Sequence, residues 1–235
     1  MKILLTIAAF CLLTGCETAQ QVLNGMNTGS TGLTSAEIAS GLKEALRIGT
    51  QNGTGKLAAA DGFFSNAAVK ILMPEEAKKV ESTLRSIGLG SLVDKAVLSM
   101  NRAAEDAAKS ATPIFVDAIK KMTITDALGI LKGGDYAATN YFKDKTTLSL
   151  TNAFRPVIEK ALTKVDATKY WNDVFTAHNK FAAKPVNTDL AGYVTERSLA
   201  GIFYEVGQQE LKIRKDPAAR VTELLKKVFG SASQQ

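Results

Sequence analysis

The chain has 235 residues, of which 46% are hydrophobic and 22% are charged, and its formal net charge is +6. This composition is typical of a globular domain with one sizeable core and excludes a membrane-spanning protein. The two cysteines, Cys11 and Cys16, both lie near the N-terminus, so the folded part has no thiol for a disulfide, a thiolate metal site or a cysteine nucleophile.

The first 16 residues resemble the export signal of a bacterial lipoprotein. Lys2 precedes an apolar run over residues 3–13, which is too short to span a membrane, and Leu13-Thr14-Gly15-Cys16 is similar to a lipobox. We therefore expect residues 1–15 to be a cleaved signal peptide and Cys16 to be the lipidated first residue of the mature protein. An ordinary cleaved signal that contains Cys16, or an uncleaved anchor, is the alternative. Glu17 follows in place of the aspartate that retains enteric lipoproteins in the inner membrane, which favours the periplasmic face of the outer membrane in a Gram-negative cell.

A flexible tether is expected over residues 16–34, which are rich in Gly, Asn, Ser and Thr and lack an apolar period. Eighteen residues of such coil span roughly 25 Å on average. The domain is therefore predicted to sit near the membrane of the cell envelope. Its charge falls from +6 to +5 when Lys2 is removed, and export makes a nucleic-acid partner unexpected. Anionic lipid headgroups or acidic envelope polymers would suit this charge, with residues 209–227 as the most basic stretch, although solvated helical faces explain the lysines equally well.

Residues 35–230 carry an almost continuous helical pattern, which predicts a single-domain all-α bundle of about eight to ten helices. A short extended connection is expected near residues 68–73, since a lone strand would have nothing to pair with. In the first half, we expect a helix from the N-cap Ser35 through Gly49 and another from Pro74 to Gly88. A third helix is expected to begin at a capping box of Ser91 and Asp94, and Pro113 should kink or end it before a continuation to Met122. A fourth runs from the cap of Thr123 and Asp126 to Gly133.

The expected second half begins after Gly134 and ends in a frayed tail over residues 231–235. It comprises a helix from Tyr136 to about Lys143, an amphipathic helix with Phe154, Ile158 and Leu162, a helix with Tyr170, Trp171 and Phe175, a long helix from about Asp189 to Arg214, and a last one from Pro217 to Gly230.

Several of these stretches resemble a bacterial family of exported proteins, domain-of-unknown-function family 4197. The similarity covers about residues 37–230. It is carried by Gly41-Leu42-Lys43-Glu44-Ala45-Leu46, by Ser99-Met100-Asn101-Arg102-Ala103-Ala104-Glu105, by Phe115-Val116-Asp117-Ala118-Ile119-Lys120 through Ala138-Thr139-Asn140-Tyr141-Phe142, by Tyr193-Val194-Thr195-Glu196, and by Asp216-Pro217-Ala218-Ala219-Arg220 and Leu224-Leu225-Lys226-Lys227-Val228-Phe229. The resemblance implies neither an activity nor catalytic residues.

Catalytic and metal-binding patterns are largely missing. His178 is the only histidine, which disfavours a histidine-dependent triad or metal site, and no cofactor is expected. Gly53-Thr54-Gly55-Lys56 follows a helix and lacks the spacing of a P-loop. Glu105 and Glu196 could in principle act as the carboxylate pair of a helical hydrolase. A polar cluster of Asn101, Arg102 and Glu105 that pins helices together explains Glu105 equally well.

A non-catalytic binding module is therefore the predicted function, for an apolar or lipid-like ligand or for an envelope partner. The alternative is a structural or assembly factor that docks a protein partner. The segment from Asp117 to Phe142 concentrates turns and caps, where binding groups usually lie on a rigid scaffold, although a sharp helix corner would show the same features. The candidate binding residues are Asn101, Arg102, Glu105, Asp117, Asp126, Thr139, Tyr141, Phe142 and Glu196.

Overall fold

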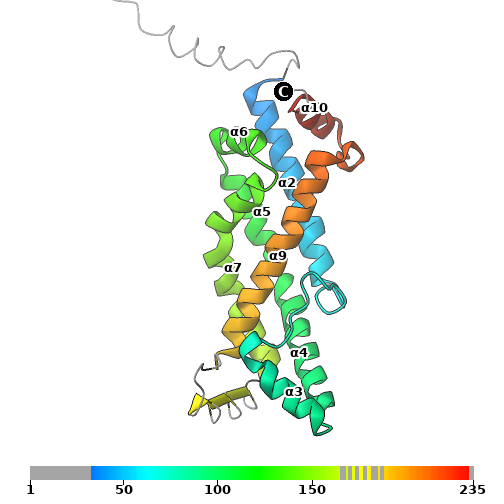
Figure 1. The fold of residues 1–235 in the computed structure, drawn as a ribbon. Coiled ribbons are helices and arrows are strands. Elements are labelled where there is room, and N and C mark those ends of the chain that lie inside the picture. The colour runs from blue at the N-terminus through cyan, green and yellow to red at the C-terminus, as the bar shows by residue number, and fades with distance from the viewer. Residues whose placement is uncertain are drawn as a thin grey trace, which may run out of the picture.

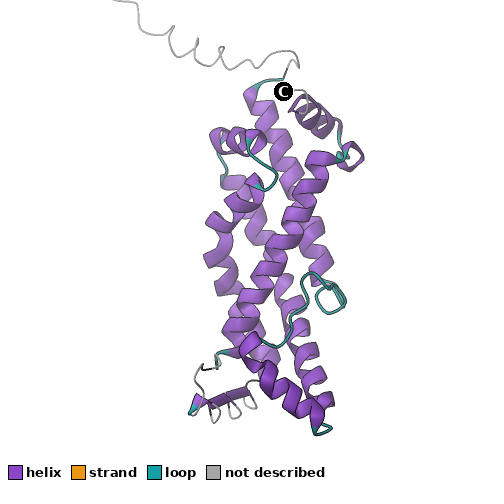
Figure 2. Ribbon diagram, viewed as in Figure 1, coloured by secondary structure: helices purple, strands orange, loops and turns teal. Residues whose placement is uncertain are grey.

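A computed structural model describes residues 33–164, 168, 171–172, 175–176, 179–180, 185 and 188–232. These residues form eight α-helices and two short 3-10 helices and contain no strand, which confirms the all-α prediction (Figures 1 and 2). No helix among them combines the length and the apolar character needed to cross a membrane. The predicted signal peptide, Cys16, nearly all of the tether, Tyr170 and His178 lie outside the described residues.

Four helical columns run side by side along the length of the bundle (Figure 1). The columns are α2 (Ser35–Ala58), α4 (Gly90–Ala108) continued by α5 (Ala111–Lys121), α7 (Ala137–Thr163) and α9 (Leu190–Lys215). The shorter elements are η1 (Glu75–Ala77), α3 (Lys78–Ser86), α6 (Ile124–Lys132), η2 (Pro217–Ala219) and α10 (Glu223–Ala232). Because α9 packs against α2, α4 and α7, it is the central helix of the bundle. The start of α2 and the C-terminal helix α10 meet at one end, and the hairpin of α3 and α4 forms the opposite end (Figure 1).

Aromatic and aliphatic side chains fill the space between the columns. Phe115 of α5 contacts Phe142 of α7 and Phe203 of α9 edge to face, with ring centroids 5.2 and 6.1 Å apart. Burying a side chain of this size contributes about 1.5–3 kcal/mol. These contacts tie three of the four columns together.

Glycine lets α2 and α9 approach closely. A Cβ atom at Gly53 would lie 3.4 Å from the backbone of Glu205 and Val206. Thr50 and Thr54 are buried beside it and donate their hydroxyl hydrogens to the carbonyls of Leu46 and Thr50. The expectation that a helix precedes Gly53-Thr54-Gly55-Lys56 is therefore wrong, because this stretch lies inside α2, where Gly53 faces α9.

Helix α7 is one continuous helix, where the sequence pattern predicted two. Its buried stripe repeats every four residues at Phe142, Thr146, Leu150, Phe154 and Ile158. A threonine interrupts the apolar pattern, but it donates its hydroxyl hydrogen to the carbonyl oxygen of Phe142 at 2.6 Å and so fits the helix interior.

Helix starts agree with the predictions at two sites. Thr123 and Asp126 form the expected capping box of α6, and Asp189 caps α9 by accepting a hydrogen bond from the amide of Gly192 at 2.8 Å.

Two other predicted caps are wrong. Thr34, not Ser35, caps α2, because its extended backbone lets its hydroxyl and the Glu37 carboxylate form a reciprocal box. At the start of α4 no side chain caps the helix, since the Asp94 carboxylate instead pairs with Arg85 at 2.9 Å.

Proline positions account for the remaining differences. The break that Pro113 predicts falls at residues 109–110, and Pro113 then occupies the first turn of α5, where a missing amide hydrogen costs little. Pro217 opens only a 3-10 turn, so the last α-helix starts later than predicted, at Glu223. That helix also continues past Gly230 to Ala232, into the predicted tail. The connection expected near residues 68–73 is only partly as predicted, because residues 67–69 form a turn and only residues 70–74 lack helix or turn structure.

Candidate functional site

Asn101 and Glu105 on α4 hold the connection between α2 and η1. The side-chain amide of Asn101 donates to the carbonyl oxygen of Ile71 at 2.8 Å and accepts from the amide of Ile71 at 2.9 Å. The Glu105 Oε1 atom accepts from the amides of Phe63 and Phe64, each at 3.2 Å. Both side chains are buried. Both side chains thus hold backbone groups of residues 63–71 by hydrogen bonds.

Arg102 extends this cluster to the surface. Its guanidinium donates to Glu105 Oε2 at 2.6 Å and to Asp61 Oδ1 at 2.8 Å. Asp61 adopts a left-handed backbone conformation with a φ of 64°, in the turn that Arg102 covers. The carboxylates hold the pKa of Arg102 above its usual value, chiefly through the hydrogen bond to Glu105. Asn101, Arg102 and Glu105 therefore lie together, as the sequence predicted, and they anchor a loop.

Thr139 belongs to a second cluster, where α6 turns into α7. The buried Glu210 of α9 accepts hydrogen bonds from the first amides of α7, at Ala138 and Thr139, each at 2.9 Å, and from the Thr139 hydroxyl at 2.8 Å. Arg214, one turn further along α9, donates to Glu210 at 2.8 Å and to the carbonyl of Ile130 at the end of α6, also at 2.8 Å. A carboxylate thus meets a helix N-terminus and a guanidinium meets a helix C-terminus, as helix dipoles favour.

The other predicted site residues do not converge. Phe142 is a core residue, and Tyr141 is half-buried beside it, where burial raises the pKa of its phenol. Asp126 is half-buried, and its pKa is lowered by its hydrogen bonds to Thr123. Asp117 pairs with Lys121 on the surface of α5. Glu196 is exposed on α9.

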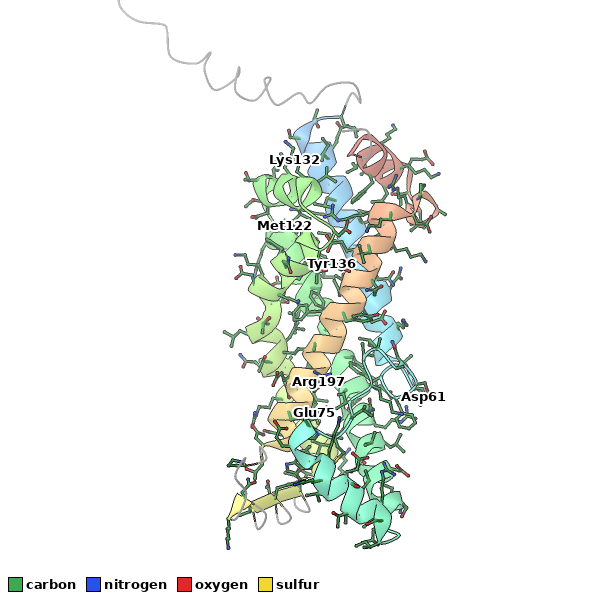
Figure 3. The ribbon with its side chains drawn as sticks, viewed as in Figure 1. Asp61, Glu75, Met122, Lys132, Tyr136 and Arg197 are labelled. Carbon is green, nitrogen blue, oxygen red and sulfur yellow. The ribbon has the colours of Figure 1, made fainter. Side chains whose placement is uncertain are left out.

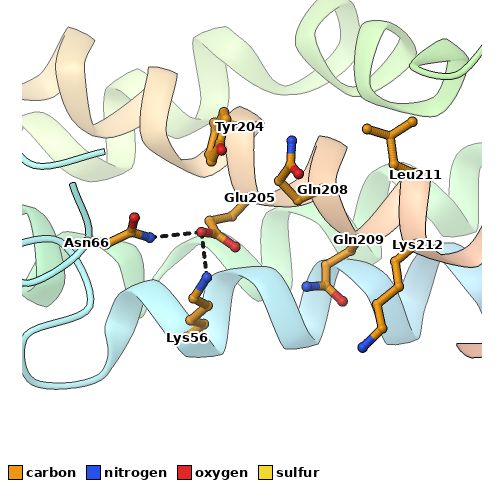
Figure 4. A pocket seen from close by; sticks show the side chains of 8 residues that line it. All are labelled: Lys56, Asn66, Tyr204, Glu205, Gln208, Gln209, Leu211 and Lys212. Atoms are coloured by element: carbon orange, nitrogen blue, oxygen red, sulfur yellow. Dashed lines mark hydrogen bonds and ion pairs between the residues drawn. The ribbon is translucent and has the colours of Figure 1, made fainter. Parts of the chain in front are cut away.

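Two open hollows flank the middle of α9. The first, of about 460 Å³, lies between α7 and α9 and is lined by Tyr136, Thr139, Asn140, Lys143, Ala200, Phe203, Tyr204, Gly207 and Gln208. The second, of about 520 Å³, lies over α9 and the end of α2 and is lined by Lys56, Asn66, Tyr204, Glu205, Gln208, Gln209, Leu211 and Lys212 (Figure 4). Tyr204 and Gln208 border both hollows. We call the two hollows together the α9 groove.

A buried carboxylate forms the floor of the second hollow. The Glu205 side chain is 3% exposed, and its Oε1 atom accepts hydrogen bonds from Lys56 Nζ at 2.7 Å and Asn66 Nδ2 at 2.9 Å (Figure 4). Its Oε2 atom accepts no hydrogen bond from the other described residues, and it is not fully enclosed, since no fully buried side-chain oxygen among them lacks a partner. One acceptor at the floor of the hollow is thus without a donor from the described residues.

Tyrosine rings form the walls of the first hollow. Tyr136 is 44% exposed and Tyr204 is 43% exposed. Tyr136 lies beside α9, because a Cβ atom at Gly207 would be only 3.2 Å from its ring (Figure 3). Only Thr139 of the predicted site residues lines the groove. The missed residues left one weak signal in the sequence: Tyr204 and Gln208, and likewise Glu205 and Gln209, are polar or amphipathic residues one helical turn apart.

A metal site and an enclosed apolar cavity find little support in the described residues. Among the described residues, no group of three or more His, Cys, Asp or Glu side chains could hold a metal ion. An apolar hollow bordered by Leu42, Ile213 and Phe229 measures only about 10 Å³, which is no larger than a water molecule requires.

Comparison with known proteins gives a family and nothing narrower. No curated protein and no solved structure matches the chain. The family model described as "Protein of unknown function (DUF4197)" matches residues 32–230, which is nearly all of the helical domain. The chain therefore belongs to the DUF4197 family, as the sequence resemblance indicated.

Proposed function

We propose that this protein is a non-catalytic binding module of the cell envelope and that it binds its ligand in the α9 groove. One observation carries the proposal: two open hollows adjoin at Tyr204 and Gln208 and present tyrosine rings, side-chain amides and a free carboxylate oxygen. Binding sites typically combine such aromatic surface with a few polar groups that fix the ligand's orientation. Helices α2 and α7 both pack against α9, so the groove is preformed.

The same geometry gives less support to the other functions that the sequence suggested. Both carboxylate oxygens of Glu105 accept hydrogen bonds, and neither Glu105 nor Glu196 lines either hollow. Neither hollow of the α9 groove therefore brings together the two carboxylates that such a hydrolase would need. An enclosed lipid-like ligand also lacks space in the apolar hollow beside Phe229. A ligand that stays partly exposed to solvent suits the open groove better.

Mass spectrometry of the natively extracted protein tests the proposal. The wild type should carry a molecule that is lost from Tyr204→Ala, and the exposed substitution Glu196→Gln on the same helix should retain it. Circular dichroism of the variants checks that the fold is intact. Identical bound molecules in the wild type and Tyr204→Ala would contradict a binding role for the groove.

The proposal includes a lipid anchor on Cys16. The support is the lipobox-like sequence Leu13-Thr14-Gly15-Cys16. Cys16→Ser should be misprocessed or released from membranes, and its intact mass should lack the acyl groups. If the variant stays in the membrane fraction with an unchanged modification, the lipobox interpretation is wrong.

A second candidate function, docking of a protein partner, is favoured by an exposed apolar tip. Ile87, Leu89 and Leu92 lie at the turn between α3 and α4 and are 63%, 40% and 53% exposed. Clusters of exposed apolar side chains often mark interaction sites. A photo-crosslinking residue at position 89 tests this candidate in cells. One discrete protein adduct, lost in Ile87→Asp, would support docking, and the absence of any adduct would contradict it.

A further inference from the structure

We infer that the ligand of the α9 groove is a glycan whose sugar rings carry carboxylate groups, and that the glycan crosses α9 with at least one ring in each hollow. The inference rests on the proposed binding function and names its ligand class. It follows from three properties of the groove: the mixture of hydrogen-bond donors and acceptors, the exposed tyrosine rings and two unpaired lysines.

The hydrogen-bonding groups of the groove suit hydroxyl groups. A hydroxyl both donates and accepts, so a ligand rich in hydroxyls is matched by neighbouring acceptors and donors. Glu205 Oε2 has no donor among the described residues, and Lys56 Nζ, which binds Oε1 of the same carboxylate, is a donor on a side chain that is 56% exposed. The amides of Gln208 and Gln209 supply both kinds of group. A purely apolar ligand would leave these groups unsatisfied, and each one that it buries would weaken its binding.

The tyrosine rings suit the apolar faces of sugar rings. A pyranose ring has a face of C–H groups and an edge of hydroxyls, so it can lie on an aromatic ring while its edge forms hydrogen bonds. Tyr136 and Tyr204 are large, rigid side chains with an apolar face and a polar tip, which allows both kinds of contact at a low entropic cost. Because Tyr204 borders both hollows, a ring stacked on it would lead from one hollow into the other.

The charge of the groove favours acidic sugars. Among the described residues, Lys143 in the first hollow and Lys212 in the second form no ion pair, whereas Lys56 is paired with Glu205. The groove thus offers one unpaired cation in each hollow. Carboxylates on two different sugar rings would meet these cations while the hydroxyls between them meet Glu205 and the amides. Charge complementarity of this kind is weakened by salt.

Calorimetric titration with defined oligomers tests the inference. The probes are a galacturonate tetramer, which is acidic, an N-acetylglucosamine tetramer, which is neutral, and a tetraglutamate peptide, which has the charge without the sugar rings. We expect saturable binding of the galacturonate tetramer that weakens with salt, weaker binding of the neutral tetramer and none of the peptide. Tyr204→Ala and Glu205→Gln should each weaken binding roughly tenfold or more, while the matched exposed substitution Glu196→Gln should not change it.

Four results would overturn the inference. Equal binding of tetraglutamate would show that charge alone is recognised. Unchanged glycan binding by Tyr204→Ala, in a variant with a wild-type circular dichroism spectrum, would place the glycan elsewhere. Absence of glycan binding, together with a non-carbohydrate molecule that copurifies in a Tyr204-dependent way, would overturn the ligand class and leave the proposed binding function standing. If no molecule of any kind depends on Tyr204, both fall.

Discussion

Replacing Glu210 by glutamine should destabilise the protein more than any other isosteric change on α9. The carboxylate accepts five hydrogen bonds, from the Ala138 amide, the amide and hydroxyl of Thr139 and two nitrogens of Arg214. In either orientation a glutamine amide would turn its NH2 group toward at least two of these donors. The side chains of Glu210 and Arg214 are only 5% and 12% exposed, so water cannot readily compensate.

The expected loss is about 3 kcal/mol of unfolding free energy, the lower end of the range for breaking a buried ion pair. For a domain of this size, such a loss lowers the melting temperature by about 6–12 °C. Urea denaturation followed by circular dichroism measures it. Glu196→Gln removes the same charge from an exposed site on the same helix and should change stability by less than about 0.5 kcal/mol. If Glu210→Gln and the control are equally stable, the Glu210 cluster does not hold α6, α7 and α9 together.

Three further predictions concern packing, acid stability and metals. Gly201→Ala should destabilise the protein by about 1–3 kcal/mol in thermal melts, because the new Cβ atom would lie 2.6 Å from the buried Phe63 ring. The control Gly129→Ala, with no neighbour within 4 Å of its Cβ atom, should stabilise the protein by up to about 1 kcal/mol. Equal effects of the two substitutions would refute the close packing of Gly201 against Phe63. The Arg155 hydrogen bond lowers the pKa of Asp189 in the folded state. Its stabilisation is therefore complete above the unfolded pKa of about 3.9 and is lost as pH falls through the lower folded pKa. Denaturation curves of the wild type and Asp189→Asn should differ at pH 6 and converge toward pH 2, and a constant difference would argue against the linkage. Chelator should leave the melting temperature unchanged, and a loss of several degrees would reveal a metal site.

Local sequence signals predicted the fold class and the helix ends that depend on neighbouring residues. The capping box of Thr123 and Asp126 and the cap at Asp189 each involve residues three apart, so the sequence displays them directly. The continuity of α7 was missed because Thr146 interrupts the buried stripe. Its hydroxyl is satisfied by the helix itself, which makes a polar residue acceptable at that core position.

The candidate site was harder to predict because it depends on contacts between distant segments. Asn101, Arg102 and Glu105 were correctly grouped, since they lie on adjacent turns of one helix. Nothing local indicates that Glu210 reaches residues 138–139 or that Glu205 reaches Lys56. The sequence also does not indicate which face of α9 stays open to solvent, because this depends on which helices cover the other faces.

The central position of α9 also bears on the order in which the chain can fold. Helix α2 ends at Ala58 and its main partner α9 begins only at Leu190, so the middle of the bundle closes late in synthesis or export. Until α9 emerges, α2, α4 and α7 lack the surface on which all three pack. Contacts between such distant segments slow folding in comparison with bundles whose neighbouring helices follow one another in sequence. The apolar faces that α9 covers therefore stay exposed until the last fifth of the sequence has been made.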